Sequence, residues 1–195
     1  MKKILICGDS FAADWTAKYP VEGWPNLLAK NYDVTNLAQA GCSEYRIYQQ
    51  LISTDLSQYD HIIVFHTSPN RLYTKVHPIH HQDILHDNSD LLYSDIKEHS
   101  KNNPSLLPIV EYFENYFDLE HASFIHNLLC EKIENLLLPY NVIHATGIDW
   151  TGLHVFNNML DFSKQAITNK GYANHFDLTG NRYVYETIVS ILNLC

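Results

Sequence analysis

Short apolar runs that end in polar or glycine-containing turns predict four β-strands in this chain. The runs are Lys3–Cys7, Asp33–Leu37, His61–Phe65 and Asn141–Ala145. The first and third runs are almost wholly apolar, which is typical of short strands that are buried on both faces. We therefore expect these two runs to lie at the centre of a sheet.

Apolar positions at helical spacing occupy the segments between these strands. One helix is predicted to open at Gly23-Trp24-Pro25, because proline suits the first turn of a helix. A second helix covers Ser43–Ile52 with Ser43 as its N-cap, and Leu106–Leu138 has the pattern of two further helices. Thr179–Leu194 is predicted to form a final amphipathic helix. Strands that alternate with helices indicate an α/β fold, with a mostly parallel sheet and helices on both faces.

Residues 74–104 differ from the rest of the chain in being polar, rich in histidine and weakly periodic. We interpret them as a surface excursion of the same domain that could act as a lid over a site. The histidines raise the alternative of a metal site, but their spacing matches no compact metal motif, and polar surface loops collect histidines readily. We therefore expect no metal here. The residues concerned are His77, His80, His81 and His86, with Asp83 and Asp87 nearby.

Length and composition favour a single globular domain over residues 1–195. Hydrophobic residues make up 46% and charged residues 18% of the chain, which is ordinary for a domain with a core of its own. The formal net charge of -9 argues against nucleic acid or an anionic membrane surface as the main partner. No segment approaches the roughly 20 apolar residues of a membrane span, and the basic start is too short for an export signal. We therefore expect a cytoplasmic protein.

The cysteines are widely spaced and include no Cys-x-x-Cys pair. This spacing suits reduced thiols better than a disulfide framework. One of them adjoins Gly41, and we interpret it as a small buried residue rather than a nucleophile. The four residues are Cys7, Cys42, Cys130 and Cys195.

Three of the predicted strands are followed by a loop with a polar side chain or a glycine. Ser10 follows the first strand, Gly41 the second and Asn70 the third. Because ligands of parallel sheets bind beyond the carboxyl ends of the strands, we expect these loops to converge at one edge. A serine nucleophile needs hydrogen-bond donors for its oxyanion, and the N–H groups of Ser10 and Gly41 and the amide of Asn70 are candidates. It also needs a general base, and His175, just before the last helix, is the best placed of twelve histidines.

Four short blocks follow one another in a characteristic order along the chain. They are GDS at residues 8–10, NLAQAG at 36–41, TSPNR at 67–71 and HFDLTGN at 175–181, of which the third is the loosest. Together they resemble the motifs of the SGNH (GDSL-type) serine hydrolase family. The resemblance implies a flavodoxin-like three-layer α/β/α sandwich and the hydrolysis of an ester or other acyl bond without a cofactor. This family includes carbohydrate deacetylases, and a small acyl group on a carbohydrate is the substrate that we expect.

One position departs from the family pattern. Many members have an aspartate three residues before the histidine as the third member of a triad, and this chain has Tyr172 there. Asp177, two residues after His175, is a substitute, but its place before Leu178 suits a helix N-cap. We therefore expect Ser10 and His175 to act as a catalytic dyad, with Asp177 in a supporting position.

Other residues near the blocks have both a functional and a structural interpretation. Asp9 adjoins Ser10, and we interpret it as support for the loop, because short acidic side chains in turns accept hydrogen bonds from N–H groups. Arg71 could hold an anionic substrate, although a salt bridge is the commoner role. Trp15 could stack on a sugar ring, whereas aromatic residues more often form a core or a cleft wall.

Two other functions are compatible with the same features. An acyltransferase would use the same serine with an alcohol or sugar acceptor in place of water. A glycan-binding or scaffolding module would keep the fold and lack catalysis, and Tyr172 at the aspartate position supports that alternative. For the hydrolase, we expect a small-molecule or glycan ester as the partner. The sequence leaves the oligomeric state open.

Overall fold

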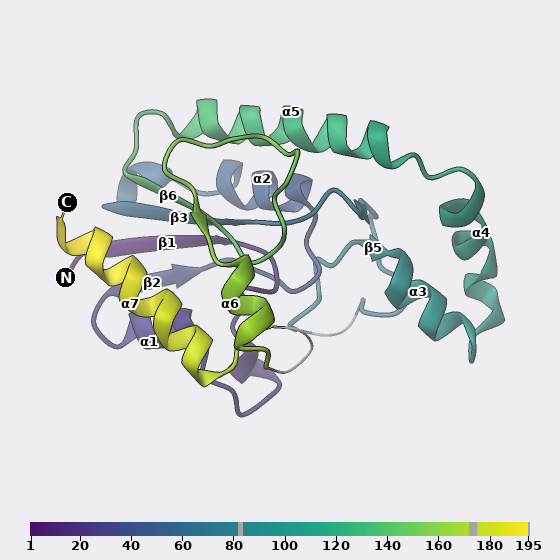
Figure 1. Cartoon of the computed structure of the whole chain (residues 1–195), viewed down its shortest axis with the longest axis horizontal. Helices are drawn as coiled ribbons and strands as arrows, with labels where there is room; N and C mark the ends of the chain where they lie inside the picture. Colours follow the sequence, from purple (N-terminus) through teal and green to yellow (C-terminus); the bar gives the residue numbers. More distant parts are fainter. Residues whose placement is uncertain (82–83, 172–174, 195) are drawn as a thin grey trace.

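The computed structural model of the chain describes residues 1–81, 84–171 and 175–194. Its centre is a five-stranded sheet with the order β2-β1-β3-β6-β7, in which all neighbouring strands are parallel (Figure 1). The four longer strands confirm the prediction from the sequence. The fifth, β7, was not predicted, because two residues are too few to produce a pattern. The strands are β1 (Lys3–Gly8), β2 (Asp33–Asn36), β3 (His61–His66), β6 (Val142–Thr146) and β7 (Leu160–Asp161).

Helices cover both faces of this sheet. Successive strand residues point to opposite faces, so Ile4 and Ile6 of β1 pack in one core while Leu5 and Cys7 pack in the other. The first core includes residues of α1 and α7, and the second includes residues of α2 and α5 (Figure 1). The fold is therefore a three-layer α/β/α sandwich, as predicted. These helices are α1 (Trp24–Ala29), α2 (Glu44–Ile52), α5 (Leu119–Leu137) and α7 (Leu178–Leu194).

The strand order decides where a ligand would bind. From β1 the chain crosses to β2 on one side and then returns to β3 on the other side. This is the flavodoxin-like order, in which the crevice for a ligand opens at the carboxyl ends of the two strands on either side of the reversal. In this chain those strands are β1 and β3, which are followed by the loops of Ser10 and Thr67.

The predicted helix boundaries are confirmed at several ends. The Ser43 side chain accepts a hydrogen bond from the Arg46 N–H, so Ser43 is the N-cap of α2. The segment from Leu106 onward forms two helices, α4 (Leu107–Asn115) and α5, and Asp118 caps the second. Short 3-10 helices lie between the longer elements: η1 (Trp15–Ala17), η2 (Leu56–Gln58) and η3 (Pro104–Leu106).

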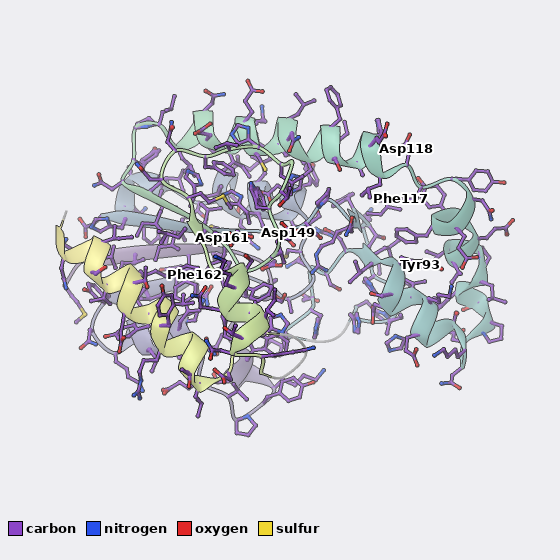
Figure 2. All side chains as sticks on the ribbon, in the orientation of Figure 1. Tyr93, Phe117, Asp118, Asp149, Asp161 and Phe162 are labelled. Atoms are coloured by element: carbon purple, nitrogen blue, oxygen red, sulfur yellow. The ribbon has the colours of Figure 1, made fainter. Side chains whose placement is uncertain are left out.

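One helix after β7 was missed by the sequence pattern. This helix, α6 (Ser163–Thr168), has no buried residue, so no apolar face signals it. Phe162, between β7 and α6, anchors the segment because its ring is buried in the core that α7 covers (Figure 2).

The excursion after β3 is more ordered than its sequence suggests. Two short strands, β4 (Arg71–Leu72) and β5 (Leu91–Leu92), pair as an antiparallel sheet at the base of the excursion. The chain then continues from β5 into α3 (Tyr93–Ser100). The helices α3 and α4 lie beside the central sheet rather than over it (Figure 1). The pattern missed α3 because only Ile96 of its eight residues is buried. A small core of their own joins these elements: Leu91, Ile96, Leu106 and Val110.

Within the described residues, Cys7, Cys42 and Cys130 are free and buried. Cys195 lies outside the described residues. No described helix has both the length and the apolar character that crossing a membrane requires.

Candidate active-site cleft

The loops of Ser10, Gly41 and His175 line one cleft of about 1000 Å³, which we call the Ser10 cleft. Ser10 follows β1, Gly41 precedes α2, and His175 precedes α7. These three residues are far apart in the sequence, and the fold brings their loops to one cleft. The cleft thus unites a hydroxyl, an imidazole and a glycine backbone. Its wall also includes Phe11, Trp15, Arg71, Asp90, Asp149 and Lys170.

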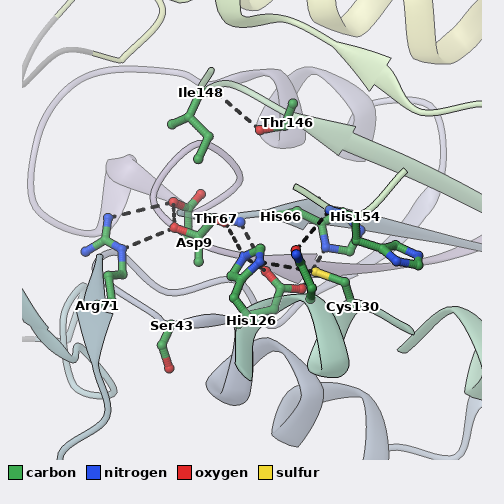
Figure 3. Close-up of polar contacts among 12 residues, drawn as sticks. Asp9, Ser43, His66, Thr67, Arg71, His126, Cys130, Thr146, Ile148 and His154 are labelled. Atoms are coloured by element: carbon green, nitrogen blue, oxygen red, sulfur yellow. Dashed lines mark hydrogen bonds and ion pairs between the residues drawn. The ribbon is translucent and has the colours of Figure 1, made fainter. Parts of the chain in front are cut away.

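The loop that carries Ser10 is held by Asp9. The Asp9 carboxylate accepts a hydrogen bond of 3.0 Å from the Phe11 N–H and one of 2.8 Å from the Thr67 hydroxyl. Burial raises the pKa of the Asp9 carboxyl, against the opposing effect of Arg71, whose guanidinium lies 3.8 Å away (Figure 3). Asp9 therefore supports the loop, in agreement with the interpretation from the sequence.

Ser10 itself is 7% exposed and lies at the floor of the cleft. Its carbonyl accepts a hydrogen bond of 2.8 Å from Trp15 Nε1. No described residue accepts a hydrogen bond from the Ser10 N–H, which leaves this donor open to the cleft. Ser10 Oγ makes no hydrogen bond to His175, and such catalytic bonds often close only when substrate is present.

Gly41 is needed for the shape of the second loop. Its φ of +82° is a conformation that L side chains rarely adopt, and a Cβ there would lie 2.6 Å from Ser89 Cβ. The neighbouring Ala40 N–H is paired with the Leu85 carbonyl. Among the described residues none accepts from the Gly41 N–H, so a second donor is open to the cleft.

His175 is positioned between two aromatic rings. Its ring centroid lies 4.6 Å from that of Trp15 and 4.9 Å from that of Phe11. The Phe11 ring is itself confined, because a Cβ on Gly147 would lie 2.5 Å from it. The His175 carbonyl accepts a hydrogen bond of 2.6 Å from the Gly171 N–H. Aromatic packing and this backbone bond help to fix the position of the base.

Two residues were considered for the place of the triad carboxylate, Asp177 and Tyr172. The Asp177 carboxylate accepts a hydrogen bond of 2.8 Å from the Gly180 N–H at the start of α7, which confirms the N-cap interpretation. Tyr172 lies outside the described residues. The three described carboxylates that line the cleft have other partners. Asp90 accepts from the Ser43 N–H, Asp149 accepts from the Thr151 N–H, and Asp95 lies 3.0 Å from His80 Nε2.

Arg71, rather than Asn70, lines the cleft at the third block. Asn70 is exposed and is not among the described lining residues. Arg71 donates a hydrogen bond of 3.1 Å from Nε to Thr67 Oγ1 and points toward Asp9 (Figure 3). The role of Asn70 as an oxyanion donor stays a prediction, and Arg71 adds a cationic group to the cleft.

The histidines of the excursion form a cluster around Asp95 at the wall of the Ser10 cleft. His80 Nε2 lies 3.0 Å and His77 Nε2 3.9 Å from Asp95 Oδ2. The His86 ring stacks on His80, with 4.8 Å between centroids. His77 is only 3% exposed, so it is not the surface residue that the sequence suggested. Asp83 of the same segment lies outside the described residues.

A metal ion does not fit well in this cluster. Ligand atoms of His77, His80 and Asp95 lie within 4.8 Å of one another. However, His77 Nδ1 accepts the N–H groups of Ile79 and His80, each at 3.2 Å. In the neutral ring the hydrogen is then on Nε2, which leaves no lone pair there for a metal. Burial, followed by the charge of His80, lowers the pKa of His77 to about 4.

A second polar group, which the sequence analysis missed, is buried behind the loop that follows β3. Glu44 Oε1 lies 2.7 Å from Nδ1 of His66, and His66 Nε2 lies 2.9 Å from His144 Nδ1. His126 and Cys130 of α5 complete this group, which we call the Glu44 cluster (Figure 3). The sequence did contain one sign of this cluster, namely histidines within the otherwise apolar strands β3 and β6.

Charges within the Glu44 cluster compensate one another. Burial opposes ionisation of Glu44, but His66 and His126 outweigh it and hold the pKa of the Glu44 carboxyl well below its usual range. Burial lowers the pKa of His144 to about 3, so its ring is neutral. The rings of Trp150 and Phe156 enclose the cluster by packing on His66.

Comparison with solved structures finds several chains of similar fold, two of which are described below. No protein-family model and no curated protein sequence matches the chain. An acetyl xylan esterase is similar over 97% of this chain and 98% of its own, with 13% identity and a TM-score of 0.42. A lipolytic protein of the G-D-S-L family from Desulfitobacterium hafniense DCB-2 is similar over 95% of this chain and 97% of its own, with 13% identity and a TM-score of 0.38. The function of this chain therefore has to be inferred from its own residues.

Proposed function

We propose that the chain is a serine hydrolase that cleaves an ester, with Ser10 as the nucleophile and His175 as the general base. The observation that carries the proposal is that Ser10, Gly41 and His175 line one cleft at the carboxyl end of the sheet. An activated serine requires a nearby base and donors for the oxyanion. The open N–H groups of Ser10 and Gly41 supply two such donors.

In the first half of the reaction, His175 removes the proton from Ser10 Oγ as that oxygen attacks the acyl carbon. The N–H groups of Ser10 and Gly41 stabilise the oxyanion, and the Asn70 amide would be a third donor only if its side chain turned into the cleft. The alcohol leaves with the proton from His175, and an acyl group remains on Ser10. Water then attacks this ester with His175 again as the base, which releases the acid and restores Ser10.

In the proposed dyad, Asp177 does not serve His175 as the carboxylate of a triad. Trp15 and Phe11 confine its ring, while Asp177 is occupied at the start of α7. Asp177→Asn retains an oxygen for the cap and removes the charge. We expect this variant to keep most of the wild-type kcat, whereas His175→Ala loses about 10³-fold or more. Equal losses in the two variants would contradict the dyad.

The substrate that we propose is a small acyl group, such as O-acetyl, on a carbohydrate. Trp15 supports a carbohydrate, because its ring is at the cleft wall beside Ser10 and sugar rings pack on aromatic faces. The cleft of about 1000 Å³ has room for more than an acetyl group. Release of acetate from acetylated oligosaccharides, compared with simple acetate esters, tests this preference.

Turnover of short-chain aryl esters tests the hydrolase itself. We expect wild-type protein to release the aryl alcohol and Ser10→Ala to lose about 10³-fold or more in kcat. Transfer of the acyl group to an added alcohol in preference to water would favour an acyltransferase instead. A wild-type protein that turns over no ester but binds glycans would favour the silent binding module.

A further inference from the structure

The Glu44 cluster has no role in the proposed hydrolysis, although it gathers several ionisable side chains in the interior. Glu44 is 2%, His66 0% and Cys130 0% exposed. The Glu44 carboxylate is already paired with His66 and His126, and a carboxylate, an imidazole and a thiol are also the donor types of a transition-metal site. We propose that Glu44, His66 and Cys130 form a binding site for a divalent transition metal of the zinc type, separate from the Ser10 cleft.

The ligand atoms are already close together. One carboxylate oxygen of Glu44, one ring nitrogen of His66 and Cys130 Sγ all lie within 4.8 Å of one another. In a tetrahedral zinc site, bonds of about 2.0–2.3 Å place the ligand atoms roughly 3.3–3.6 Å apart. Small side-chain shifts would reach that geometry. A carboxylate, an imidazole and a thiolate are the donor types that zinc accepts, whereas magnesium and calcium prefer oxygen alone.

Neighbouring groups form hydrogen bonds to these ligands, as the groups around the ligands of known metal sites commonly do. The Thr67 N–H donates to Glu44 Oε2 at 3.2 Å, while Oε1 lies 2.7 Å from His66 Nδ1, a contact that a bound metal would replace. His66 Nε2 lies 2.9 Å from Nδ1 of His144, so the His66 ring can donate from Nε2 and coordinate from Nδ1. Metal-bound histidines commonly donate from their second nitrogen in this way.

His126 positions the other two ligands. Its Nε2 lies 2.7 Å from the Thr67 carbonyl and 3.5 Å from Glu44 Oε2. Its Nδ1 lies 3.6 Å from Cys130 Sγ. One ring thus contacts both the carboxylate and the sulfur, and the backbone contact fixes its orientation (Figure 3).

Charge balance favours a divalent ion. When the metal binds, the Cys130 S–H bond breaks and its proton passes to solvent. The hydrogen that His66 Nδ1 shares with Glu44 Oε1 also leaves Nδ1, and the neutral His66 ring then carries its hydrogen on Nε2. Bonds form from sulfur, Nδ1 and Oε1 to the metal. No oxidation or reduction is involved. The thiolate and the Glu44 carboxylate together neutralise a 2+ ion, so the ion and its three ligands, with His66 bound as a neutral ring, would carry no net charge.

A second cavity provides a route to the site. This cavity, of about 310 Å³, is lined by Glu44 and His126 on one side and by residues of the corner between α4 and α5 on the other. Phe117 and Asp118 mark that corner (Figure 2). Of the three proposed ligands, Glu44 is the one among the described lining residues of this cavity. Arg71 lines both this cavity and the Ser10 cleft, and it therefore lies between the two.

Cobalt(II) titration of protein produced without a histidine tag tests the proposal. We expect one equivalent to bind with a thiolate-to-cobalt charge-transfer band, and one equivalent of zinc to displace it. The band should disappear in Cys130→Ser and persist in Cys42→Ser, which changes another buried thiol. It should also persist in His80→Ala, which disrupts the cluster around Asp95.

Two kinds of result would overturn the site. One is a wild-type protein that binds no cobalt or binds it without a thiolate band. The other is a band that survives Cys130→Ser or is lost in His80→Ala or Cys42→Ser. Should Cys130→Ser fail to fold, Glu44→Gln decides, because glutamine keeps the side-chain shape and the oxygen for Thr67. This variant should weaken cobalt binding by about tenfold or more, and unchanged affinity would contradict the proposal.

Discussion

The Thr67 hydroxyl donates a hydrogen bond of 2.8 Å to the Asp9 carboxylate, which joins the loops that follow β1 and β3. Both residues are buried. Thr67 Oγ1 also accepts from Arg71 Nε, and the Thr67 N–H donates to Glu44. One threonine therefore connects the serine loop of the Ser10 cleft with the Glu44 cluster (Figure 3).

Thr67→Val tests this connection, because valine keeps the shape and removes the hydroxyl. The variant leaves a buried carboxylate without one of its donors, which costs about 1–3 kcal/mol of unfolding free energy. We also expect a lower kcat, since the loop of Ser10 loses a support. Urea unfolding measures the first effect and ester turnover the second.

The matched control for this change is Thr35→Val in β2. Thr35 is half-buried, and its hydroxyl makes no hydrogen bond within the described chain. Its loss should change stability by less than about 0.5 kcal/mol. Equal effects of the two variants would show that the bond between Thr67 and Asp9 contributes nothing specific.

Gly41→Ala should damage both stability and catalysis. The new methyl group would combine an unfavourable φ with a clash against Ser89. We expect a loss of about 2–4 kcal/mol in unfolding free energy, together with a reduced kcat because the Gly41 N–H is displaced. Gly152→Ala separates the two causes, because Gly152 has a φ of +77° with nothing within 4 Å of the added atom. This control should lose only about 1 kcal/mol, and a loss as large as that of Gly41→Ala would contradict the argument.

The stability of the protein should fall in mildly acidic solution because of His77. The unfolded residue takes up a proton near pH 6.5, whereas the folded residue does so only near pH 4. Between these values the unfolded chain binds more protons, so the free energy of unfolding decreases as the pH is lowered. His80 and Asp95 face His77 directly, and His86 and His99 add positive charge when protonated.

His77→Asn removes this titration and keeps an acceptor for the N–H groups of Ile79 and His80. The difference in unfolding free energy between wild type and variant should shrink by about 2 kcal/mol from pH 7 to pH 5. Urea unfolding at the two pH values measures it. His121→Asn, at an exposed position of α5, should show a constant difference. A constant difference for His77→Asn as well would contradict the assignment.

The parts of the fold that could be predicted are those with a local pattern. β1 and β3 are runs of apolar residues, Ser43 caps α2, and Asp177 caps α7, so each is visible in a few neighbouring residues. β7 and α6 have no such pattern, because the first has two residues and the second buries none. Their places depend on packing against β6 and the core around Phe162.

In the candidate site, too, the residues next to a recognisable element could be predicted, and those set by tertiary packing could not. Ser10, Gly41 and His175 could be selected because each follows or precedes an element whose end was recognisable. The contact between His66 and His144 could not be predicted from the sequence. It joins residues 78 positions apart and depends on the register of β3 against β6.

The third block is a related case. Counting along the sequence selects Asn70, but the chain turns into β4 directly afterwards, and it is Arg71 that lines the cleft. Side-chain direction at that turn follows from the pairing of β4 with β5, which the sequence pattern did not reveal.

Labelling with a fluorophosphonate probe, followed by mass spectrometry of the peptides, tests the central claim most directly. The probe reacts with a serine only when a base and an oxyanion site activate it. The account predicts one label per chain, located on Ser10, absent in Ser10→Ala and greatly reduced in His175→Ala. An unlabelled wild-type protein, or a label on a residue other than Ser10, would contradict it.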